Sequence, residues 1–169
     1  MARTLPRNIK GYTSFIDGWG MAGITTGGKL PVIKAKVEGY RDGGMDGEDE
    51  LEFGIEKLES ELTFSELNET VMLAVLGRDK PITLRGSMEG EGPNAVAIPV
   101  IAQMRGLVTS VDPGEWGDPK KGEVKLALTP NYYRLRIGGR EIYEIDLLNG
   151  VRRIGGVDQL AGRRAALGL

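Results

Sequence analysis

The chain of 169 residues carries 22 Lys and Arg against 24 Asp and Glu, and it contains neither cysteine nor histidine. These counts exclude disulfides, thiolate metal sites and every catalytic arrangement that needs a histidine or a cysteine. The nearly balanced charge also argues against a protein that coats nucleic acid. The length predicts a single domain, residues 1–169. The start shows no targeting segment and no later stretch could span a membrane, so we expect cytosolic origin.

Two nucleotide-binding signatures overlap in residues 18–31, GWGMAGITTGGKLP. One spells G-x-G-x-x-G, and the other gives most of a Walker A loop. Both signatures need a following helix, whose N-terminus holds the phosphate. Here two threonines, two glycines and Pro31 follow the first glycines. The stretch therefore predicts a β-hairpin, with a second turn at Gly27 and Gly28, and no phosphate site.

Apolar and polar residues alternate along most of the remaining chain, which is the period-two pattern of β-strands. Residues 33–37 predict one strand, with Ile33, Ala35 and Val37 on its apolar face, and a glycine- and acid-rich loop follows it. Farther along, Leu58, Leu62 and Phe64 share the expected core face. Four later runs show the same alternation: 80–88, 94–111, 123–139 and 140–146. Roughly seven strands joined by Gly and Pro turns predict a β-sandwich or barrel.

Two short helices are also predicted, and both are expected to pack against the sheets. The first covers residues 66–76, where Ser65 can act as the N-cap and Gly77 can end the helix in the left-handed conformation. The second falls within residues 157–169. Asp158 lies near its start and two arginines lie toward its end, as the helix dipole favours.

Acidic residues gather in two places. Glu141 and Glu144 have opposite strand parity, so only Glu144 and Asp146 can converge, and we interpret these as solvated or salt-bridged charges. The acids of residues 46–50 lack the ligand order of an EF-hand, which favours a flexible or interface loop. We therefore predict no catalytic residue, no metal ligand and no cofactor.

The chain resembles, over essentially its whole length, the major tail tube proteins of contractile-tailed bacteriophages and of R-type pyocins, which are phage-tail-like bacteriocins. Residues 37–59 are similar to that family's Tyr-Arg-x-Gly-Gly-Met-Asp loop and the strand after it, and SFIDGWGMAG is similar to the family's start. Further motifs occur in the family's order: Tyr143-Glu144-Ile145-Asp146, Asn149-Gly150-Val151, Gly156-Val157-Asp158 and Leu167-Gly168-Leu169.

This resemblance implies a mainly β tail tube fold, a β-sandwich or barrel-like structure with one flanking α-helix and a short C-terminal helix. The fold is related to the tube protein of type VI secretion. Hexameric rings, in which each subunit lends four strands to a continuous barrel, stack into the inner tube of a contractile tail. Sheath contraction drives the tube through the target cell envelope, and in a phage the tube conducts DNA. The particle is a phage or a headless tailocin.

The resemblance also implies partners and a location. The partners are further copies of the chain, the tail sheath protein, the baseplate and tail terminator proteins, and a tape measure protein in the lumen. DNA passes through without specific binding if the particle is a phage, and no membrane anchor is expected. The protein belongs to the virion tail or tailocin particle and is assembled in the cytoplasm of the bacterial host.

Three groups of candidate residues follow from the resemblance. Residues 40–50 are expected to form an inter-ring loop, and residues 149–169 a C-terminal docking segment. Glu59 and Glu61 are expected to face the lumen. Either some nearby lysines turn toward neighbouring subunits, which we favour, or the wall is a mixed, salt-bridged surface. The expected interface residues are Tyr40, Arg41, Gly43, Gly44, Met45, Asp46, Val157, Asp158, Leu160 and Leu167.

Two other function classes stay open on the sequence. One is a carbohydrate- or metal-dependent β-sandwich enzyme. The other is a single-stranded nucleic-acid binder on an oligonucleotide-binding barrel, which needs a basic groove with aromatic residues, and none is evident in the sequence. Rings or tubes formed by the pure protein would separate the structural class from both.

Overall fold

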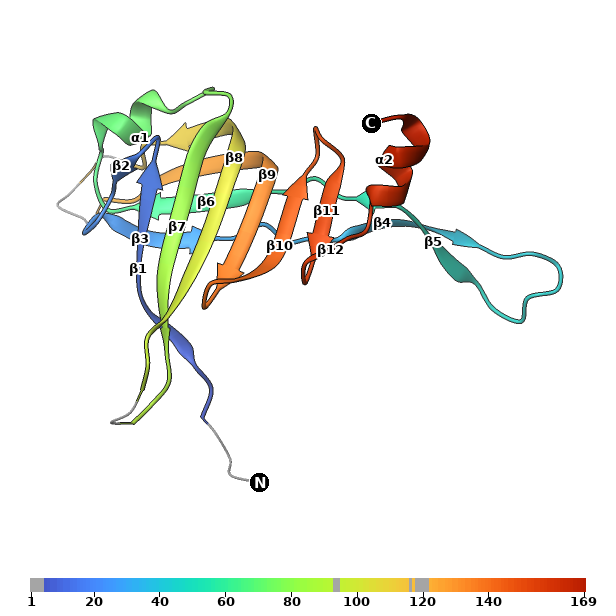
Figure 1. Cartoon of the computed structure of the whole chain (residues 1–169). Helices are drawn as coiled ribbons and strands as arrows, with labels where there is room; N and C mark the ends of the chain where they lie inside the picture. Colours follow the sequence, from blue (N-terminus) through green and yellow to red (C-terminus); the bar gives the residue numbers. More distant parts are fainter. Residues whose placement is uncertain (1–4, 93–94, 116, 118–121) are drawn as a thin grey trace.

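The computed structural model describes residues 5–92, 95–115, 117 and 122–169, and within these ranges the protein is mainly β with two short helices (Figure 1). The strands are β1 (Asn8–Ile16), β2 (Trp19–Gly20), β3 (Thr25–Lys29), β4 (Ala35–Tyr40), β5 (Asp49–Ile55), β6 (Ser60–Phe64), β7 (Lys80–Glu89), β8 (Ile98–Asp112), β9 (Val124–Ile137), β10 (Arg140–Asp146), β11 (Val151–Ile154) and β12 (Val157–Asp158). The helices are α1 (Glu69–Leu73) and α2 (Ala161–Leu167). The predicted fold class is confirmed, although the described strands outnumber the roughly seven expected. Residue 94, where one predicted run began, lies outside the described residues.

The strands form two layers. The front layer is an antiparallel sheet in the order β12-β11-β10-β9-β8-β7-β1-β2. The back layer contains β3 and β6, and β6 pairs with the first half of β9. The strands β8 and β9 are the longest and remain paired along most of their length, so they run from the front layer into the back layer. The two layers are therefore parts of one bent sheet.

The bend in β8 and β9 requires a glycine at residue 106. The register between the two strands shifts between Arg105 and Gly106, where Gly106 lies opposite Pro130. A Cβ atom added at Gly106 would lie 2.1 Å from the carbonyl oxygen of Thr129. Such a register shift inserts an extra residue and sharpens the local bend of a strand pair. No residue larger than glycine fits there without moving the backbone.

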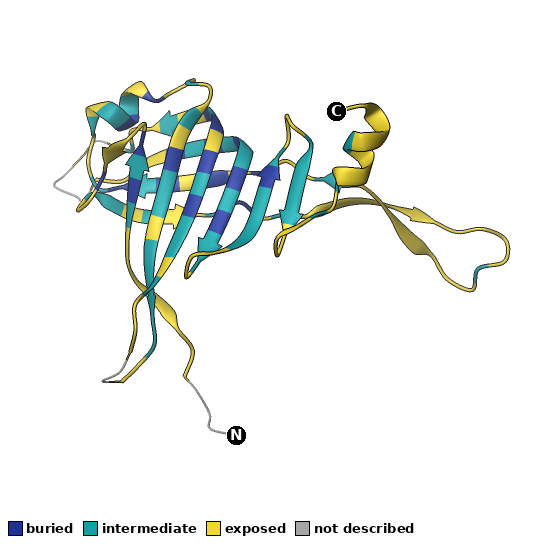
Figure 2. Cartoon of the chain, viewed as in Figure 1, coloured by how far each residue is buried: buried dark blue, intermediate teal, exposed yellow. Residues whose placement is uncertain are grey.

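The core lies between the two layers, and Figure 2 shows buried residues recurring along the front strands. Leu58, Leu62 and Phe64 are each at most 1% exposed, which confirms their predicted core face. From the front layer, Ile82 and Tyr133 belong to the same buried cluster. Burial of a large apolar side chain contributes about 1.5–3 kcal/mol. The same burial raises the pKa of Tyr133 to about 12.

The predicted hairpin at residues 18–31 is only partly correct. Asp17 and Gly18, both with positive φ, make its first turn between β1 and β2. The expected second turn at Gly27 and Gly28 is wrong, because both residues lie within β3. A Cβ atom at Gly28 would approach Leu84 Cδ2 to 2.9 Å. We infer that glycine serves here to let the two layers approach closely.

The first helix is shorter than predicted and has a different cap. Asn68, rather than Ser65, caps α1 by accepting a hydrogen bond from the Thr70 N–H at 3.0 Å. The left-handed residue after the helix is Leu76, with φ 57°, rather than Gly77. The second helix begins later than residue 157, and the left-handed residue that ends it is Gly168. Within the described ranges, neither helix has the length and apolar character needed to cross a bilayer.

Replacement of Gly106 by alanine should destabilise the subunit by about 3 kcal/mol, because the new methyl group collides with the backbone of β9. Chemical denaturation of the purified chain measures the loss. Gly11→Ala in β1 is the matched control, since a Cβ atom there has no neighbour within 4 Å. Equal stability of the two variants would show that the bend tolerates a side chain.

Candidate assembly surfaces

A two-stranded hairpin, β4 and β5, projects from the body of the protein (Figures 1 and 2). Every residue of β4 is exposed, and β5 is exposed as far as Phe53. The predicted apolar face of residues 33–37 is therefore wrong for Ala35 and Val37, and only Ile33 is partly buried. The alternation was a correct strand signal, but the described residues place no second layer against this hairpin.

The two faces of the hairpin differ in chemistry. In the register of the pair, Glu38 lies opposite Leu51 and Tyr40 lies opposite Asp49. Because strand faces alternate and opposed residues share a face, Tyr40, Leu51 and Phe53 lie on one face together with Glu38 and Asp49. We call the three apolar residues of this face the apolar stripe. Their exposed fractions are 50%, 44% and 56%, respectively. Exposed apolar side chains gathered in this way are typical of a protein interaction surface.

The tip of the hairpin contains the predicted loop residues. Asp42 accepts a hydrogen bond from the Gly44 N–H at 2.8 Å, and Arg41 Nε donates to the Met45 carbonyl at 3.2 Å. Arg41 is thus engaged within its own chain, whereas the side chain of Asp46 is exposed. The hairpin as a whole is acidic. It contains two basic residues, Lys36 and Arg41, and these acidic ones: Glu38, Asp42, Asp46, Glu48, Asp49, Glu50 and Glu52.

Asp158 organises the C-terminal segment. Its carboxylate accepts hydrogen bonds from Arg164 Nη2 at 2.5 Å and from the Leu160 N–H at 3.1 Å. The Arg164 hydrogen bond, with help from the backbone N–H groups of Leu160 and Arg152, lowers the pKa of Asp158 to about 2. Arg164 also donates to the Gly150 carbonyl at 2.7 Å. Asp158, which was predicted to lie at an interface, therefore forms its contacts within its own chain, where it joins α2 to β11.

The other predicted residues of this segment divide by exposure. Leu160 precedes α2 and is half-buried. Val157 and Leu167 are 68% and 67% exposed, although both are apolar. These two side chains, unlike Asp158, are available for contact with another molecule.

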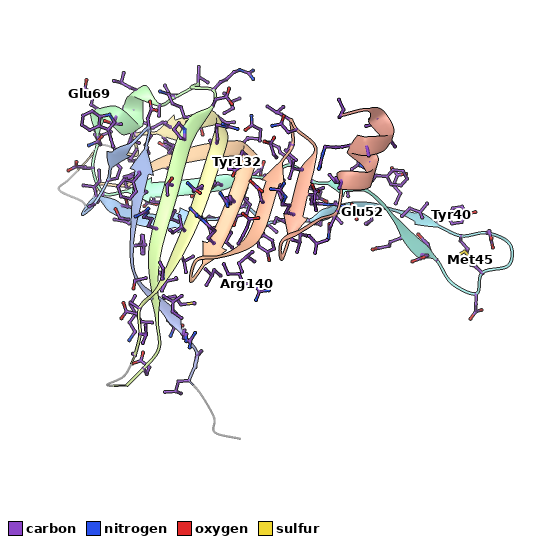
Figure 3. The ribbon with its side chains drawn as sticks, in the orientation of Figure 1. Tyr40, Met45, Glu52, Glu69, Tyr132 and Arg140 are labelled. Atoms are coloured by element: carbon purple, nitrogen blue, oxygen red, sulfur yellow. The ribbon has the colours of Figure 1, made fainter. Side chains whose placement is uncertain are left out.

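An ion pair that the sequence did not reveal brings the hairpin and the C-terminal segment together. Arg152 Nη1 donates to Glu52 Oε1 at 2.5 Å, across 100 positions of sequence. Figure 3 shows Glu52 beside the C-terminal elements, with Tyr40 and Met45 farther out along the hairpin. The signal that could have found this pair is the parity of Arg152. It lies opposite the buried Ile145, where an apolar residue is expected.

The predicted lumen residues lie on the back layer. Both Glu59 and Glu61 are exposed. Lys57 donates to Glu59 at 2.9 Å, and this hydrogen bond lowers the pKa of Glu59. Glu61 lies in register with Lys29 of β3. Lys57 and Glu59 therefore pair within one chain, whereas Glu61 and Lys29 are related by register alone.

Two of the three acids of β10 form ion pairs with neighbouring strands. Arg134 Nε donates to Glu141 Oε2 at 2.7 Å, and Glu144 pairs with Arg153. Glu144 is salt-bridged, in line with the prediction, whereas Asp146 accepts hydrogen bonds from the N–H groups of Leu148 and Asn149. The predicted opposite faces of Glu141 and Glu144 are wrong. A bulge between Glu141 and Tyr143 shifts the parity, so that Glu141 and Glu144 face the same side. Among the described residues, no three acidic side chains gather in a way that could hold a metal ion.

Comparison with known proteins gives a consistent result along the chain. Residues 6–168 match the family of phage tail tube protein FII. The chain is 31% identical to the tail tube protein of Escherichia phage P2 over 172 residues, which cover 98% of this chain and 99% of that protein. It is 28% identical to the major tail tube protein of Serratia phage KSP20 over 168 residues, which cover 98% of each chain.

The lowered pKa of Asp158 predicts a pH-dependent contribution to stability. The folded pKa of about 2 lies below the ordinary value of 3.8, so the ionised carboxylate stabilises the fold above about pH 4, and this stabilisation is lost as the pH falls toward 2. Asp158→Asn should lower the melting temperature at neutral pH, with a difference from wild type that shrinks below about pH 4. Asp46→Asn, at the exposed tip, is the control. A difference that stays constant down to pH 2 would contradict this role.

Proposed function

Because the chain belongs to the phage tail tube protein FII family, it is a structural protein of a phage tail tube, and we propose that it assembles into hexameric rings that stack into a hollow tube. The match over residues 6–168 carries this proposal. The exposed apolar stripe supports it, because such a surface is favourable only when a partner covers it. We assign residues 1–169 to one tail tube domain, with 40–50 as the inter-ring loop and 149–169 as the docking segment.

The proposed tube acts mechanically and needs no catalysis. A contractile sheath surrounds it and drives it through the cell envelope of the target. Baseplate and terminator proteins bind its two ends, and a tape measure protein occupies the lumen before ejection. In a phage the lumen then conducts DNA, whereas in a headless tailocin it does not. The subunits assemble in the cytoplasm of the bacterial host.

The back layer is the proposed wall of the lumen. It consists of four adjacent segments, namely β3, β6, the first half of β9 and the last part of β8. This equals the number of strands that each subunit of the resembled family lends to the barrel. Among the described residues β3 pairs with β6 alone, and we assign its other edge to pairing with a neighbouring subunit. Pairing across subunits satisfies the backbone groups of such an edge and removes it from solvent.

Glu59 and Glu61 lie on the exposed face of this layer and are proposed to line the channel. The ion pair between Lys57 and Glu59, and that between Glu123 and Lys125 at 3.1 Å, give the face alternating charges. Each cation that binds a phosphate adds affinity and so slows DNA. A lysine already paired with a glutamate offers less attraction, so this wall neither holds nor strongly repels a polyanion.

Contact between rings is assigned to the hairpin. Tyr40 and Met45, toward its tip, lie away from the body of the subunit (Figure 3), and the apolar stripe is exposed. Phe53 and Tyr40 supply large apolar area, which usually dominates the energy of an interface. The proposed partner is a second copy of the chain in the next ring.

Electron microscopy of the concentrated pure protein tests this assignment. Wild type should form rings or tubes of uniform diameter, and the double variant Leu51→Ser, Phe53→Ser should remain folded but form no tubes. Exposed positions of this kind change the stability of the monomer by only about 0.5 kcal/mol. Val37→Ser on the opposite face is the control and should still form tubes. Normal tubes from the double variant would overturn the role of the stripe.

A charge reversal tests the lumen. In tubes built from the double variant Glu59→Lys, Glu61→Lys, a DNA fragment should be retained more strongly, with a steeper dependence of binding on salt concentration. The control is the double variant Glu66→Lys, Glu69→Lys, which makes the same change of charge at two exposed positions near α1, away from the proposed lumen. If the two kinds of tube hold DNA equally, Glu59 and Glu61 do not line the channel.

A further inference from the structure

We propose that Arg152 is a positioning residue, which fixes the direction in which the hairpin leaves the body through its ion pair with Glu52. The hairpin itself carries the assembly contact, so this inference rests on the proposed function. Three features support this role: the attachment of the hairpin at its base, its second attachment farther out, and the contacts that hold Arg152 in place.

The base attaches the hairpin to the body at one place, where Ile33 and Ile55 pack against the core. There the Glu56 N–H donates to the Lys34 carbonyl at 2.8 Å, and the side chains of these two residues also pair at 2.7 Å. Both belong to the same two connecting segments, so neither bond sets the angle between hairpin and body. Gly54, with φ 109°, lies next to this base, and a Cβ atom there would meet nothing within 4 Å. Glycine with positive φ and free space around it is suited to a hinge.

The Arg152 to Glu52 pair joins the hairpin to a different part of the chain. Glu52 lies on the hairpin face opposite the apolar stripe, and its carboxylate accepts the hydrogen bond from Arg152 at 2.5 Å. This contact lies beyond Gly54 when followed outward from the base. Two separated attachments fix the direction of the hairpin relative to the body, whereas a single attachment at the base would let the hairpin rotate. The face that carries Glu52 is thereby held against the body, and the apolar stripe is turned outward.

Arg152 is held more firmly than an ordinary surface arginine. Its side chain is 14% exposed, compared with 43% for the neighbouring Arg153. The backbone of Arg152 is paired on both sides. It lies in register with Ile145 of β10, and its carbonyl accepts from the Gln159 N–H at 2.8 Å. Gln159 follows Asp158, whose carboxylate binds Arg164 of α2. The position of the hairpin therefore depends on the fold of the C-terminal segment.

The expected consequence is a loss of orientation without a loss of fold. Without the pair, the hairpin samples several directions, and only some of them present the stripe to a neighbour. If the productive direction is populated about one tenth of the time, the concentration needed for tube formation rises about tenfold. The apolar contact itself is unchanged, so a high protein concentration should restore tubes.

The absence of cysteine allows a direct measurement of this orientation. Spin labels at Asp46→Cys in the tip and at Arg140→Cys, the exposed first residue of β10, report the distance between hairpin and body. The doubly labelled full chain is diluted into an excess of unlabelled chain, so that distances within one subunit dominate. Pulsed electron paramagnetic resonance should give one narrow distance distribution for wild type and a broad one for Arg152→Ala.

Matched variants separate the positioning role from a general effect on folding. Arg153→Ala removes the adjacent arginine and its ion pair with Glu144, and it should leave the distribution narrow. Glu52→Gln removes the charge on the exposed hairpin and should broaden the distance distribution. This variant keeps the test valid if Arg152→Ala unfolds. The charge exchange Glu52→Arg with Arg152→Glu should narrow it again.

Two results would overturn the proposal. One is a narrow distribution in both Arg152→Ala and Glu52→Gln, and the other is equal broadening in Arg153→Ala. The distance is measured within one chain, so it does not depend on tube formation. If wild type forms no tubes but the distances behave as expected, Arg152 still positions the hairpin and the tube proposal alone fails.

Discussion

The fold depends on the bend that carries β8 and β9 from one layer to the other. A sheet has one face to bury, and a continuous pair of strands that turns back on itself lets one sheet cover its own apolar face. The hydrogen bonds between β8 and β9 continue on both sides of the bend, so the turn costs few backbone partners. The bend at Gly106 thus creates both the core and the back layer. The outer face of this layer is not needed for the core and can form the proposed wall of the lumen.

Prediction of the fold succeeded where local pattern and tertiary packing agree. The alternation around Leu62 identified a true core face, because one side of β6 is buried and the other is exposed at Glu61 and half-buried at Thr63. It failed where a single residue changes the register, as in the bulge at Glu141, since a bulge leaves no trace in composition or periodicity. It also failed for the first helix, where Ser65 and Asn68 are both acceptable caps. Only the path of the chain selects Asn68, while the hydroxyl of Ser65 donates to the Ile24 carbonyl.

The candidate surfaces were predictable as segments but not as contacts. The resemblance pointed to residues 40–50 and 149–169, yet no sequence pattern joined them. The Arg152 to Glu52 pair spans 100 positions, and although the parity of Arg152 marks a charge at an apolar position, nothing in the sequence identifies Glu52 as its partner. The role of Asp158 within its own chain was likewise hidden, because its partners come from backbone groups and from the following helix. Periodicity shows which face a side chain occupies, and it does not show what lies opposite.

The distribution of charge on the hairpin also constrains the symmetry of association. Two subunits could cover their apolar stripes by pairing hairpin against hairpin about a twofold axis, which would give a closed dimer with no growing end. That arrangement brings two strongly acidic hairpins together, and like charges face to face cost several kcal/mol. A contact between the hairpin and a different region of the next copy avoids this repulsion and leaves a free hairpin for the copy after it. The acids around Tyr40 thus favour an open, repeating assembly over a closed pair.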